Sequence, residues 1–552
     1  MEKNGAQIIL EVLHEHQIDT IFGYPGGAVI PFYHELHDQM DRFKHIRTSH
    51  EQGAVHAADG YSRSTGKLGV CVVTSGPGVT NTITGIATAY MDSAPLLVIS
   101  GQVPSVLLGK DSFQEVDITG IAMPVSKYTF LVRDLKDMEK TVRKAIKIAT
   151  SGRPGPVLID IPKDLFIKQT TYPSEADMSF EMQSPTVDMA KVQKAVELIN
   201  ASEKPIVYAG GGIRIANASE ALRTFCLSKE IPIVNTLMSL GTFPRKHDLS
   251  LGMVGMHGYP EANLAITHSD LIIAIGARFS DRVIGNPKDF APNAKVVHID
   301  FDLTEFSKNI DSDIDLCGSL NEILAAFNER VNVKKRQAWI DEIVAYSKIQ
   351  QEKPGDVMTP KNLIQTVAEG VGDSAVIVTD VGQHQMWTAQ YYPFTEPRQF
   401  ITSGGLGTMG FGLGAAIGTK LGNMDKPIVL FTGDGSFRMN CNELATVSGY
   451  NLPILIVLMN NHALGMVRQW QKLFQGERYA ETTIEQNVDY CKLAGAYGID
   501  SIKADNLKTL EDAVRQYRET GKALFVECTI DQNEDVYPIV PPGQSIDKYI
   551  LR

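Results

Sequence analysis

The 552-residue sequence has few cysteines, no excess of basic residues and no long apolar run. The six cysteines, at positions 71, 226, 317, 441, 491 and 528, are too far apart for the paired spacing of zinc or redox motifs and suit a reducing compartment. The formal net charge of −12 argues against binding to nucleic acid. The apolar run at 452–459 is too short to span a bilayer, and the polar N-terminus lacks the apolar core of a signal peptide. We therefore expect a cytoplasmic, multi-domain enzyme with no membrane contact.

Short runs rich in Val, Ile and Leu recur along the chain, and most end in glycine. They lie at 69–78, 95–101, 156–162, 205–212, 231–236, 271–278, 295–300, 375–382, 427–436, 452–461 and 523–530. Helical stretches separate them, for example at 138–149. Continuous apolar strands alternating with helices form parallel sheets covered on both faces, so we predict an α/β fold of three doubly wound sheets. Polar joints near 167–190 and 333–360 would place the domains at 1–166, 188–333 and 358–535.

Glycines cluster where these strands are predicted to end, in TSGPG, YAGGG, GAR, TSGGLG and TGDG. Ligands of open α/β sheets bind outside the carboxyl ends of the strands, and glycine lets the backbone approach a ligand closely. A single glycine after a strand is as often simple turn chemistry. The density of such turns favours nucleotide or phosphate ligands.

The segment from Gly433 to Asn461 carries the strongest single motif. Gly433-Asp434-Gly435-Ser436 follows one predicted strand, and Asn460-Asn461 ends the next. In a βαβ unit the two strand ends lie side by side, so Asp434 and Asn461 converge with oxygen ligands only. That ligand set suits Mg²⁺, which also takes phosphate oxygens.

This segment resembles the diphosphate-binding motif of thiamine diphosphate enzymes. The resemblance implies Mg²⁺ held by Asp434, Asn461, the main-chain carbonyl of Ala463 and the cofactor diphosphate. It also implies a catalytic glutamate in the N-terminal domain, and HEQGAVHAADGYSRSTGK (50–67) supplies Glu51. In the family this carboxylate binds a pyrimidine nitrogen of the cofactor and sets up general-base catalysis through the cofactor. The family's active site joins two subunits, which implies at least a homodimer.

Longer motifs are similar to the acetohydroxyacid synthase (acetolactate synthase) family over essentially the whole chain. They are FGYPGGAVIPFY (22–33), TSGPGVTN (74–81), KDSFQEVDITGIAMPVSKY (110–128), RPGPVLIDIPKD (153–164), GMHG (255–258), GARFSDRVIGN (276–286), VGQHQMWTAQ (381–390), SGGLGTMGFG (403–412), LGMVRQW (464–470) and VYPIVPPG (536–543). The last motif implies that 536–552 is a tail folding over the active site.

The resemblance assigns roles to individual residues. Arg282 would pair with the carboxylate of a second 2-oxoacid, which a guanidinium fork fits well. Trp470 would line the acceptor pocket and favour 2-oxobutanoate over pyruvate, while Phe113, Gln114 and Lys163 would line the substrate channel. The residues implied to contact thiamine diphosphate are Tyr24, Pro25, Gly26, Pro77, Asn81, Gly382, Gln383, His384, Gly407, Met409, Gly433, Asp434, Gly435, Ser436, Asn461, Gly465 and Met466.

The middle domain resembles the FAD-binding domain of the same family, although YAGGGIR is only loosely similar to a GxGxxG fingerprint. Asp300, at the end of KVVHID, fits the ribose-binding acid that follows a Rossmann-like strand. The sequence departs from the family pattern at Ser280 and at Cys317-Gly318-Ser319, where acids are usual or frequent. The implied FAD contacts are Arg153, Gly210, Gly211, Gly212, Thr236, Leu237, Met256, His257, Gly276, Arg278 and Asp300.

The resemblance implies decarboxylation of pyruvate on thiamine diphosphate and joining of the hydroxyethyl enamine to a second 2-oxoacid, pyruvate or 2-oxobutanoate. The products, 2-acetolactate or 2-aceto-2-hydroxybutanoate, serve branched-chain amino acid biosynthesis. The alternatives are a catabolic acetolactate synthase without FAD, a flavin-redox pyruvate oxidase and a non-catalytic nucleotide-binding scaffold. GARFSDRV and Trp470 favour the FAD-dependent enzyme. Homodimer or homotetramer and a small regulatory subunit remain open, and neither nucleic acid nor membrane is expected as a partner.

Overall fold

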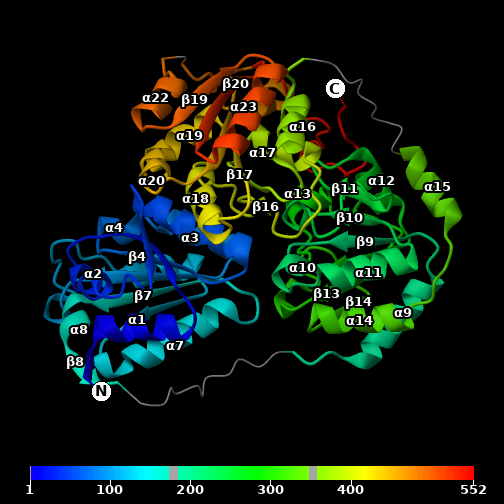
Figure 1. The fold of residues 1–552 in the computed structure, drawn as a ribbon. Coiled ribbons are helices and arrows are strands. Elements are labelled where there is room, and N and C mark those ends of the chain that lie inside the picture. The colour runs from blue at the N-terminus through cyan, green and yellow to red at the C-terminus, as the bar shows by residue number, and fades with distance from the viewer. Residues whose placement is uncertain (1, 173–184, 347–356, 486, 552) are drawn as a thin grey trace.

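The computed structural model describes residues 2–172, 185–346, 357–485 and 487–551. Three six-stranded parallel sheets succeed one another along the chain, and a two-stranded antiparallel ribbon pairs β1 (Glu2–Asn4) with β8 (Gln169–Thr171). Figure 1 shows each sheet with its own helices as a separate α/β unit, coloured blue to cyan, green, and yellow to red. The predicted fold is confirmed, because the three sheets are parallel and each of the eleven apolar runs overlaps one of their strands. Within the described ranges, none of the helices is both long and apolar enough to cross a bilayer.

The N-terminal sheet has the strand order β3-β2-β4-β5-β7-β6. Its central strands β4, β5 and β7 are buried along their whole length, as continuous apolar runs require. The strands are β2 (Thr20–Tyr24), β3 (Lys44–Arg47), β4 (Gly69–Val73), β5 (Leu96–Gln102), β6 (Tyr128–Leu131) and β7 (Pro156–Pro162). The helices are α1 (Gly5–Glu15), α2 (Ile30–His37), α3 (Glu51–Thr65), α4 (Pro77–Thr80), α5 (Ile83–Met91), α6 (Ile118–Ala122), α7 (Met138–Thr150) and α8 (Lys163–Ile167).

The middle sheet has the order β11-β10-β9-β12-β13-β14. Its strands are β9 (Pro205–Ala209), β10 (Ile233–Asn235), β11 (Ser250–Met253), β12 (Leu271–Ile275), β13 (Lys295–Asp300) and β14 (Ile314–Cys317). The helices are α9 (Met189–Ala201), α10 (Gly212–Ile215), α11 (Ser219–Lys229), α12 (Pro260–His268), α13 (Asp281–Ile284), α14 (Leu320–Arg330) and α15 (Gln337–Tyr346). Helix α15 lies in the second predicted joint, and its Trp339 and Ile343 are buried against this domain.

The C-terminal sheet has the order β16-β15-β17-β18-β20-β19. Its strands are β15 (Val376–Thr379), β16 (Phe400–Ile401), β17 (Ile428–Gly433), β18 (Ile454–Asn460), β19 (Asp500–Ala504) and β20 (Leu524–Thr529). The helices are α16 (Pro360–Val371), α17 (Gln383–Tyr391), α18 (Gly412–Gly422), α19 (Asp434–Asn440), α20 (Leu444–Gly449), α21 (Gly465–Phe474), α22 (Tyr490–Ala496) and α23 (Leu507–Thr520). Parts of the predicted joints, residues 173–184 and 347–356, lie outside the described residues.

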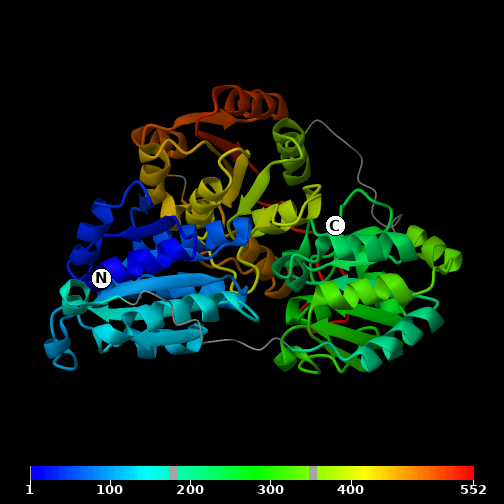
Figure 2. The same cartoon turned by 60° about the horizontal axis from the view of Figure 1, so that its bottom comes forward.

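Helices α3 and α18 join the first and last domains (Figure 2). Their backbones touch because glycine stands at the crossing points. A methyl group on Gly60 of α3 would overlap the Ala415 carbonyl, and one on Gly418 of α18 would overlap the Ala57 carbonyl. One continuous apolar core therefore runs from the N-terminal sheet through both helices to the C-terminal sheet.

The segment after β20 returns to the middle domain. Val540 N donates to Met256 O at 2.8 Å, and Asn263 Nδ2 donates to Ile546 O at 3.0 Å. Val536 N donates to Gln469 Oε1 of α21, and Gln469 Nε2 donates to Val536 O. Residues 536–551 thus fasten the middle domain to the C-terminal domain.

Candidate active site

A cavity of about 1570 Å³ opens where the middle, C-terminal and N-terminal domains meet, and the N-terminal domain contributes Arg63, Asp92 and Arg153 to its lining. Glycine turns at the carboxyl ends of β9, β12 and β15 form much of its wall, as expected for ligand sites of open α/β sheets. Every residue predicted to contact FAD lines it, from Arg153 to Asp300. Gly382, Gly407, Met409, Met466, Arg282 and Trp470 line it as well. The structure thus brings together two groups of residues that the sequence assigned to two different cofactors.

Asp434 and Asn461 lie at the ends of the adjacent parallel strands β17 and β18, whose register pairs Gly433 with Met459. Burial raises the pKa of Asp434 to about 6, and its Oδ2 has no hydrogen-bond partner among the described residues. A buried carboxylate oxygen without a partner is costly unless a cation or donor meets it. Among the described residues, no three or more His, Cys, Asp or Glu side chains are grouped so that they could hold a metal ion. Asp434 with amide and carbonyl oxygens therefore fits a magnesium ion that takes its remaining ligands from a diphosphate.

Residues at the start of α17 contact the predicted metal-binding residues. Gln383 Oε1 accepts from Asn461 Nδ2 at 3.0 Å, and a methyl group on Gly465 would overlap that same Gln383 oxygen. Burial lowers the pKa of His384 to about 3, so its ring is neutral, and its Nε2 has no partner in the described part of the chain. A methyl group on Gly433 would lie 2.9 Å from the His384 ring. The His384 ring thus packs directly against Gly433, and its partnerless Nε2 fits a diphosphate oxygen.

Ser436 and Ala463 make hydrogen bonds that fix the turns around the predicted metal site. Ser436 Oγ donates to Val381 O at 2.8 Å, which ties α19 to the turn before α17. Ala463 N donates to Asn461 Oδ1 at 3.2 Å and so fixes the turn after β18. Gly435 adjoins Met409, whose Cε would lie 3.7 Å from a methyl group placed there.

Arg282 and Trp470 face each other across the cavity wall. Arg282 lies on the short helix α13, and the centre of its guanidinium group is 5.9 Å from the centroid of the Trp470 ring. The Arg282 side chain is 64% exposed, and its only ion pair among the described residues, with Asp281, spans 3.8 Å. This weakly paired guanidinium can receive a carboxylate beside an aromatic surface.

The predicted flavin residues surround the ends of β9, β12 and β13. A methyl group on Gly210 would overlap the Gly276 carbonyl, so the glycine turn is required for these loops to pack. Burial raises the pKa of Asp300 to about 6. These features and the size of the cavity fit a dinucleotide such as FAD.

Acidic residues other than those predicted accompany Asp300. Arg153 donates to Asp302 Oδ2 at 3.1 Å and to Glu305 Oε1 at 2.6 Å, while Glu305 Oε2 is buried without a partner among the described residues. Ser280, in place of the usual acid, caps helix α13. Arg153 is thus anchored by carboxylates at the cavity wall.

Glu51 stands at the first residue of α3, in a different part of the chain's surface. Its Oε2 accepts from Asn81 Nδ2 at 3.0 Å, and Pro77 begins the helix that precedes Asn81. A carboxylate is favoured at a helix N-terminus by the helix dipole. The structure therefore brings the predicted pyrimidine-side residues of the N-terminal domain together.

Gln114 and Lys163 belong to this N-terminal group. The Gln114 backbone and Cβ adjoin Gly76, and Lys163 begins α8 after β7. Phe113 is 88% exposed, and Tyr24 is 39% exposed at the end of β2. The described residues that line the cavity include none of the N-terminal group: Tyr24, Pro25, Gly26, Glu51, Pro77, Asn81, Phe113, Gln114 and Lys163.

Sequence reasoning missed Asp380. It is 2% exposed and accepts hydrogen bonds from Gly410 N at 2.8 Å and from Thr432 Oγ1 at 3.2 Å, so it fixes the backbone next to Met409. Burial raises its pKa to about 6. Its position at the end of an apolar run, in TDVG, was the available signal.

Comparison with known proteins shows the family to which the chain belongs. Family models described as the N-terminal TPP binding domain, the central domain and the C-terminal TPP binding domain of thiamine pyrophosphate enzymes match residues 3–121, 192–327 and 380–528. The acetolactate synthase large subunit of Lactococcus lactis is 43% identical over 99% of this chain and 96% of its own length. The isozyme 2 large subunit of Escherichia coli is 43% identical over 98% of each chain. The chain belongs to the acetolactate synthase large-subunit family of thiamine pyrophosphate enzymes.

The archaeal relative from Methanocaldococcus jannaschii, described as a probable acetolactate synthase large subunit, is 42% identical over 98% of this chain and 94% of its own length. The predicted family and its thiamine cofactor are thereby confirmed. The roles assigned to individual site residues remain predictions, as do the domain boundaries.

Proposed function

We propose that this acetolactate synthase family member decarboxylates pyruvate and joins the remaining two-carbon unit to a second 2-oxoacid, pyruvate or 2-oxobutanoate. The observation that carries the proposal is the cavity in which Arg282 and Trp470 face the turns bearing Gly382, Gly407 and Met409. An acceptor carboxylate bound there would lie beside the turns expected to hold the cofactor. One carbon dioxide leaves for each 2-acetolactate or 2-aceto-2-hydroxybutanoate formed.

Thiamine diphosphate supplies the electron sink for decarboxylation when it is bound. The chain's own part begins with Glu51, which would hold a proton at a pyrimidine nitrogen and so place the cofactor in its reactive tautomer. Asn81 donates to one Glu51 oxygen, which leaves the other for this role. Met409, beside Gly435, would support the cofactor from beneath and keep its two rings close.

Magnesium would be held by Asp434, Asn461 and the carbonyl of Ala463. The partnerless Asp434 oxygen and the oxygen-only surroundings support this assignment. The ion would neutralise the diphosphate, while His384 and Gln383 would contact its oxygens. These groups orient the cofactor and leave the chemistry to it.

Arg282 would bind the acceptor carboxylate through its planar fork, and Trp470 would favour the extra methyl group of 2-oxobutanoate over pyruvate. Gln114, Lys163 and Phe113 would guide the substrate from the N-terminal domain. FAD would occupy the middle-domain end of the cavity as a structural group with no net redox role. The anchored Arg153 and the acceptor Asp300 support that placement.

The active unit would be at least a homodimer, because Glu51 and its neighbours do not line the cavity among the described residues. A second copy would bring its own Glu51 to this chain's cavity, and a homotetramer is an equally consistent assembly. The relatives are described as large subunits, which supports a small regulatory subunit as a further partner. Six free cysteines support a reducing, cytoplasmic location.

One assay tests this function. The purified chain is supplied with thiamine diphosphate and Mg²⁺, and product is measured with pyruvate alone and with pyruvate plus 2-oxobutanoate. We expect 2-acetolactate in the first case and mainly 2-aceto-2-hydroxybutanoate in the second, together with a flavin band in the visible spectrum. Pyruvate-dependent consumption of oxygen or quinone without acetolactate would identify a flavin-redox enzyme instead.

A further inference from the structure

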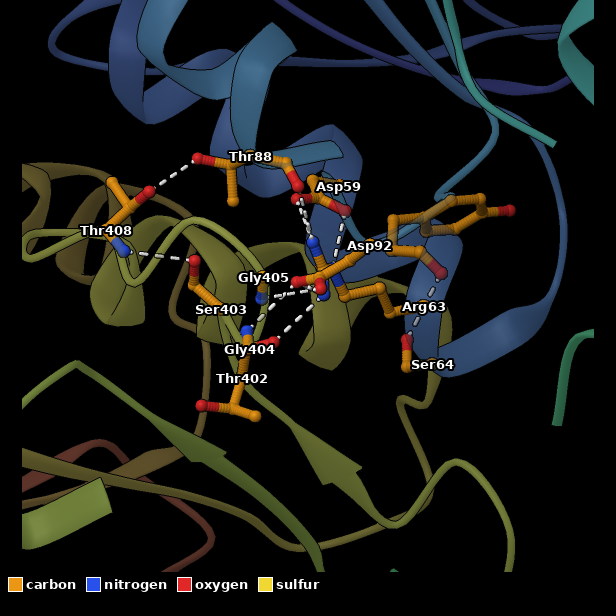
Figure 3. Close-up of polar contacts among 12 residues, drawn as sticks. Asp59, Arg63, Ser64, Thr88, Asp92, Thr402, Ser403, Gly404, Gly405 and Thr408 are labelled. Atoms are coloured by element: carbon orange, nitrogen blue, oxygen red, sulfur yellow. Dashed lines mark hydrogen bonds and ion pairs between the residues drawn. The ribbon is translucent and has the colours of Figure 1, made fainter. Parts of the chain in front are cut away.

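A buried ion cluster joins the last turn of α3 to the end of α5. Arg63 donates from Nε and Nη2 to the two Asp59 oxygens at 2.7 and 2.9 Å, and from Nη1 to Asp92 Oδ2 at 2.7 Å (Figure 3). The three side chains are at most 1% exposed. Charges so deeply buried persist only when every polar atom has a partner.

The cluster is completed by a loop of the C-terminal domain, residues 402–410, here named the glycine loop. Arg63 Nη1 also donates to Thr402 O at 2.9 Å, while Gly404 N and Gly405 N donate to Asp92 at 3.0 and 2.7 Å. Figure 3 shows Arg63 and the two glycine amides converging on Asp92 from opposite domains.

Further contacts fix the remainder of the glycine loop. Thr408 N donates to Ser403 Oγ at 3.0 Å, and the Thr408 hydroxyl pairs with that of Thr88 on α5 at 2.7 Å. Asp380 holds Gly410 N at 2.8 Å. The loop is therefore attached at both ends and in the middle.

Two carboxylates face one guanidinium in this cluster, so Asp92 depends on the loop amides as well as on Arg63. If the glycine loop moved away, Asp92 would lose two of its hydrogen-bond donors, Gly404 N and Gly405 N. Losing hydrogen bonds to a charged group is unfavourable in free energy, so these bonds hold the loop in one position.

Gly407 and Met409 lie on the glycine loop and line the cavity. We propose that Arg63 and Asp92 are positioning residues that hold Gly407 and Met409 where thiamine diphosphate binds. This inference rests on the proposed function. Cofactor binding needs such groups preorganised by a supporting shell of hydrogen bonds, and a misplacement of 1 Å costs about a hundredfold in rate.

Under this proposal the two ends of helix α3 have different roles. Its first residue, Glu51, would serve the site completed by the partner's cavity, whereas Arg63 at its other end acts on the glycine loop of its own chain. The two ends of α3 would therefore belong to two different active sites of the dimer.

The first test measures thiamine diphosphate binding by calorimetry in Asp92→Asn and Arg63→Lys, with Ser64→Ala as the matched control. Ser64 follows Arg63, is buried, and bonds only to the Tyr61 carbonyl of its own helix among the described residues. We expect the dissociation constant to rise about tenfold or more in both cluster variants and to stay unchanged in Ser64→Ala. If either variant fails to fold, Thr408→Val, which removes only the hydroxyl pair with Thr88, replaces it. Unchanged cofactor affinity in folded cluster variants would overturn the proposal.

Mixed dimers separate this role from an effect on Glu51. Chains carrying Glu51→Gln are co-expressed with chains carrying Asp92→Asn under two different affinity tags, and the mixed species is purified. One of its two sites would then combine an intact Glu51 with an intact glycine loop, so we expect roughly half of the wild-type activity. Activity no higher than that of either parent would mean that Asp92 acts on Glu51 of its own chain.

A second pair of variants distinguishes failure of the positioning role from failure of the shared active site. Mixed dimers of Glu51→Gln with Asp434→Asn must regain activity if active sites are shared between subunits. Recovery in that pair without recovery in the Asp92→Asn pair refutes the positioning role alone. A wild-type chain that makes no acetolactate refutes the proposed function itself.

Discussion

The Arg282 guanidinium and the Trp470 indole ring lie 5.9 Å apart, on two elements from different domains. Helix α13 supplies the cation and α21 the aromatic surface, so the proposed acceptor site needs both domains in contact. The tail at 536–551 fastens these domains to each other and thus sets the separation of the two side chains.

Replacing Trp470 by Leu removes the aromatic wall beside Arg282. We expect the preference for 2-oxobutanoate over pyruvate to fall about tenfold, since one methylene group in a fitted pocket is worth about 1–3 kcal/mol. This preference is measured as the ratio of the two products in an assay in which both acceptors compete. Arg468→Ala is the control, because Arg468 lies on the same helix but stacks on Tyr479 and does not line the cavity. An unchanged product ratio in Trp470→Leu would place the acceptor elsewhere.

Replacing Glu51 by Gln keeps the shape of the side chain but removes its negative charge. We expect kcat to fall by about a hundredfold or more, the usual worth of general acid–base catalysis, with an unchanged thermal midpoint. Glu35→Gln is the matched control, because Glu35 accepts from Asn4 Nδ2 much as Glu51 accepts from Asn81. Near-normal activity in Glu51→Gln would exclude it as the catalytic carboxylate.

Gly418→Ala should destabilise the protein although alanine normally strengthens a helix. The added methyl group would overlap the Ala57 carbonyl of α3, and such overpacking costs about 1–3 kcal/mol. A methyl group on Gly495 in α22 would have nothing within 4 Å. We therefore expect Gly495→Ala to raise the free energy of unfolding by about 0.5–1 kcal/mol, the usual effect of this change in a helix. Thermal denaturation distinguishes the two, and equal midpoints for both variants would contradict the close contact of α3 with α18.

Asp160 gives the stability a pH dependence. Burial raises its pKa to about 7, although Ser100 Oγ and Gln102 Nε2 donate to it. The folded chain therefore binds this proton more tightly than the unfolded chain, and this group's contribution to stability falls as pH rises from about 4 to 7. At about 1.4 kcal/mol for each pKa unit, the change reaches up to about 4 kcal/mol.

Urea unfolding of wild type and Asp160→Asn at several pH values checks this sign. The free energy of unfolding of the variant minus that of the wild type should increase from pH 4 to pH 7. A difference that does not depend on pH would show that Asp160 titrates near its ordinary value.

The sequence predicted the interior strands of all three sheets except β2, because uninterrupted apolar runs mark strands that are covered on both faces. It missed edge strands such as β3 and β19, whose polar residues carry no such pattern. Asp434 and Asn461 were predictable because each directly follows a strand. Arg63 and Asp92 were not, because their roles arise from contacts with a loop of the C-terminal domain that is distant in sequence.

The contact of α3 with α18 also bears on how the chain folds as it is synthesised. All the strands of the N-terminal sheet precede residue 172, yet the glycine-lined side of α3 finds its cover only after Gly412 to Gly422 have been made. Domains generally fold as they emerge from the ribosome, and uncovered apolar faces promote aggregation. The N-terminal domain is therefore complete in sequence while one face of α3 stays uncovered until α18 has been made.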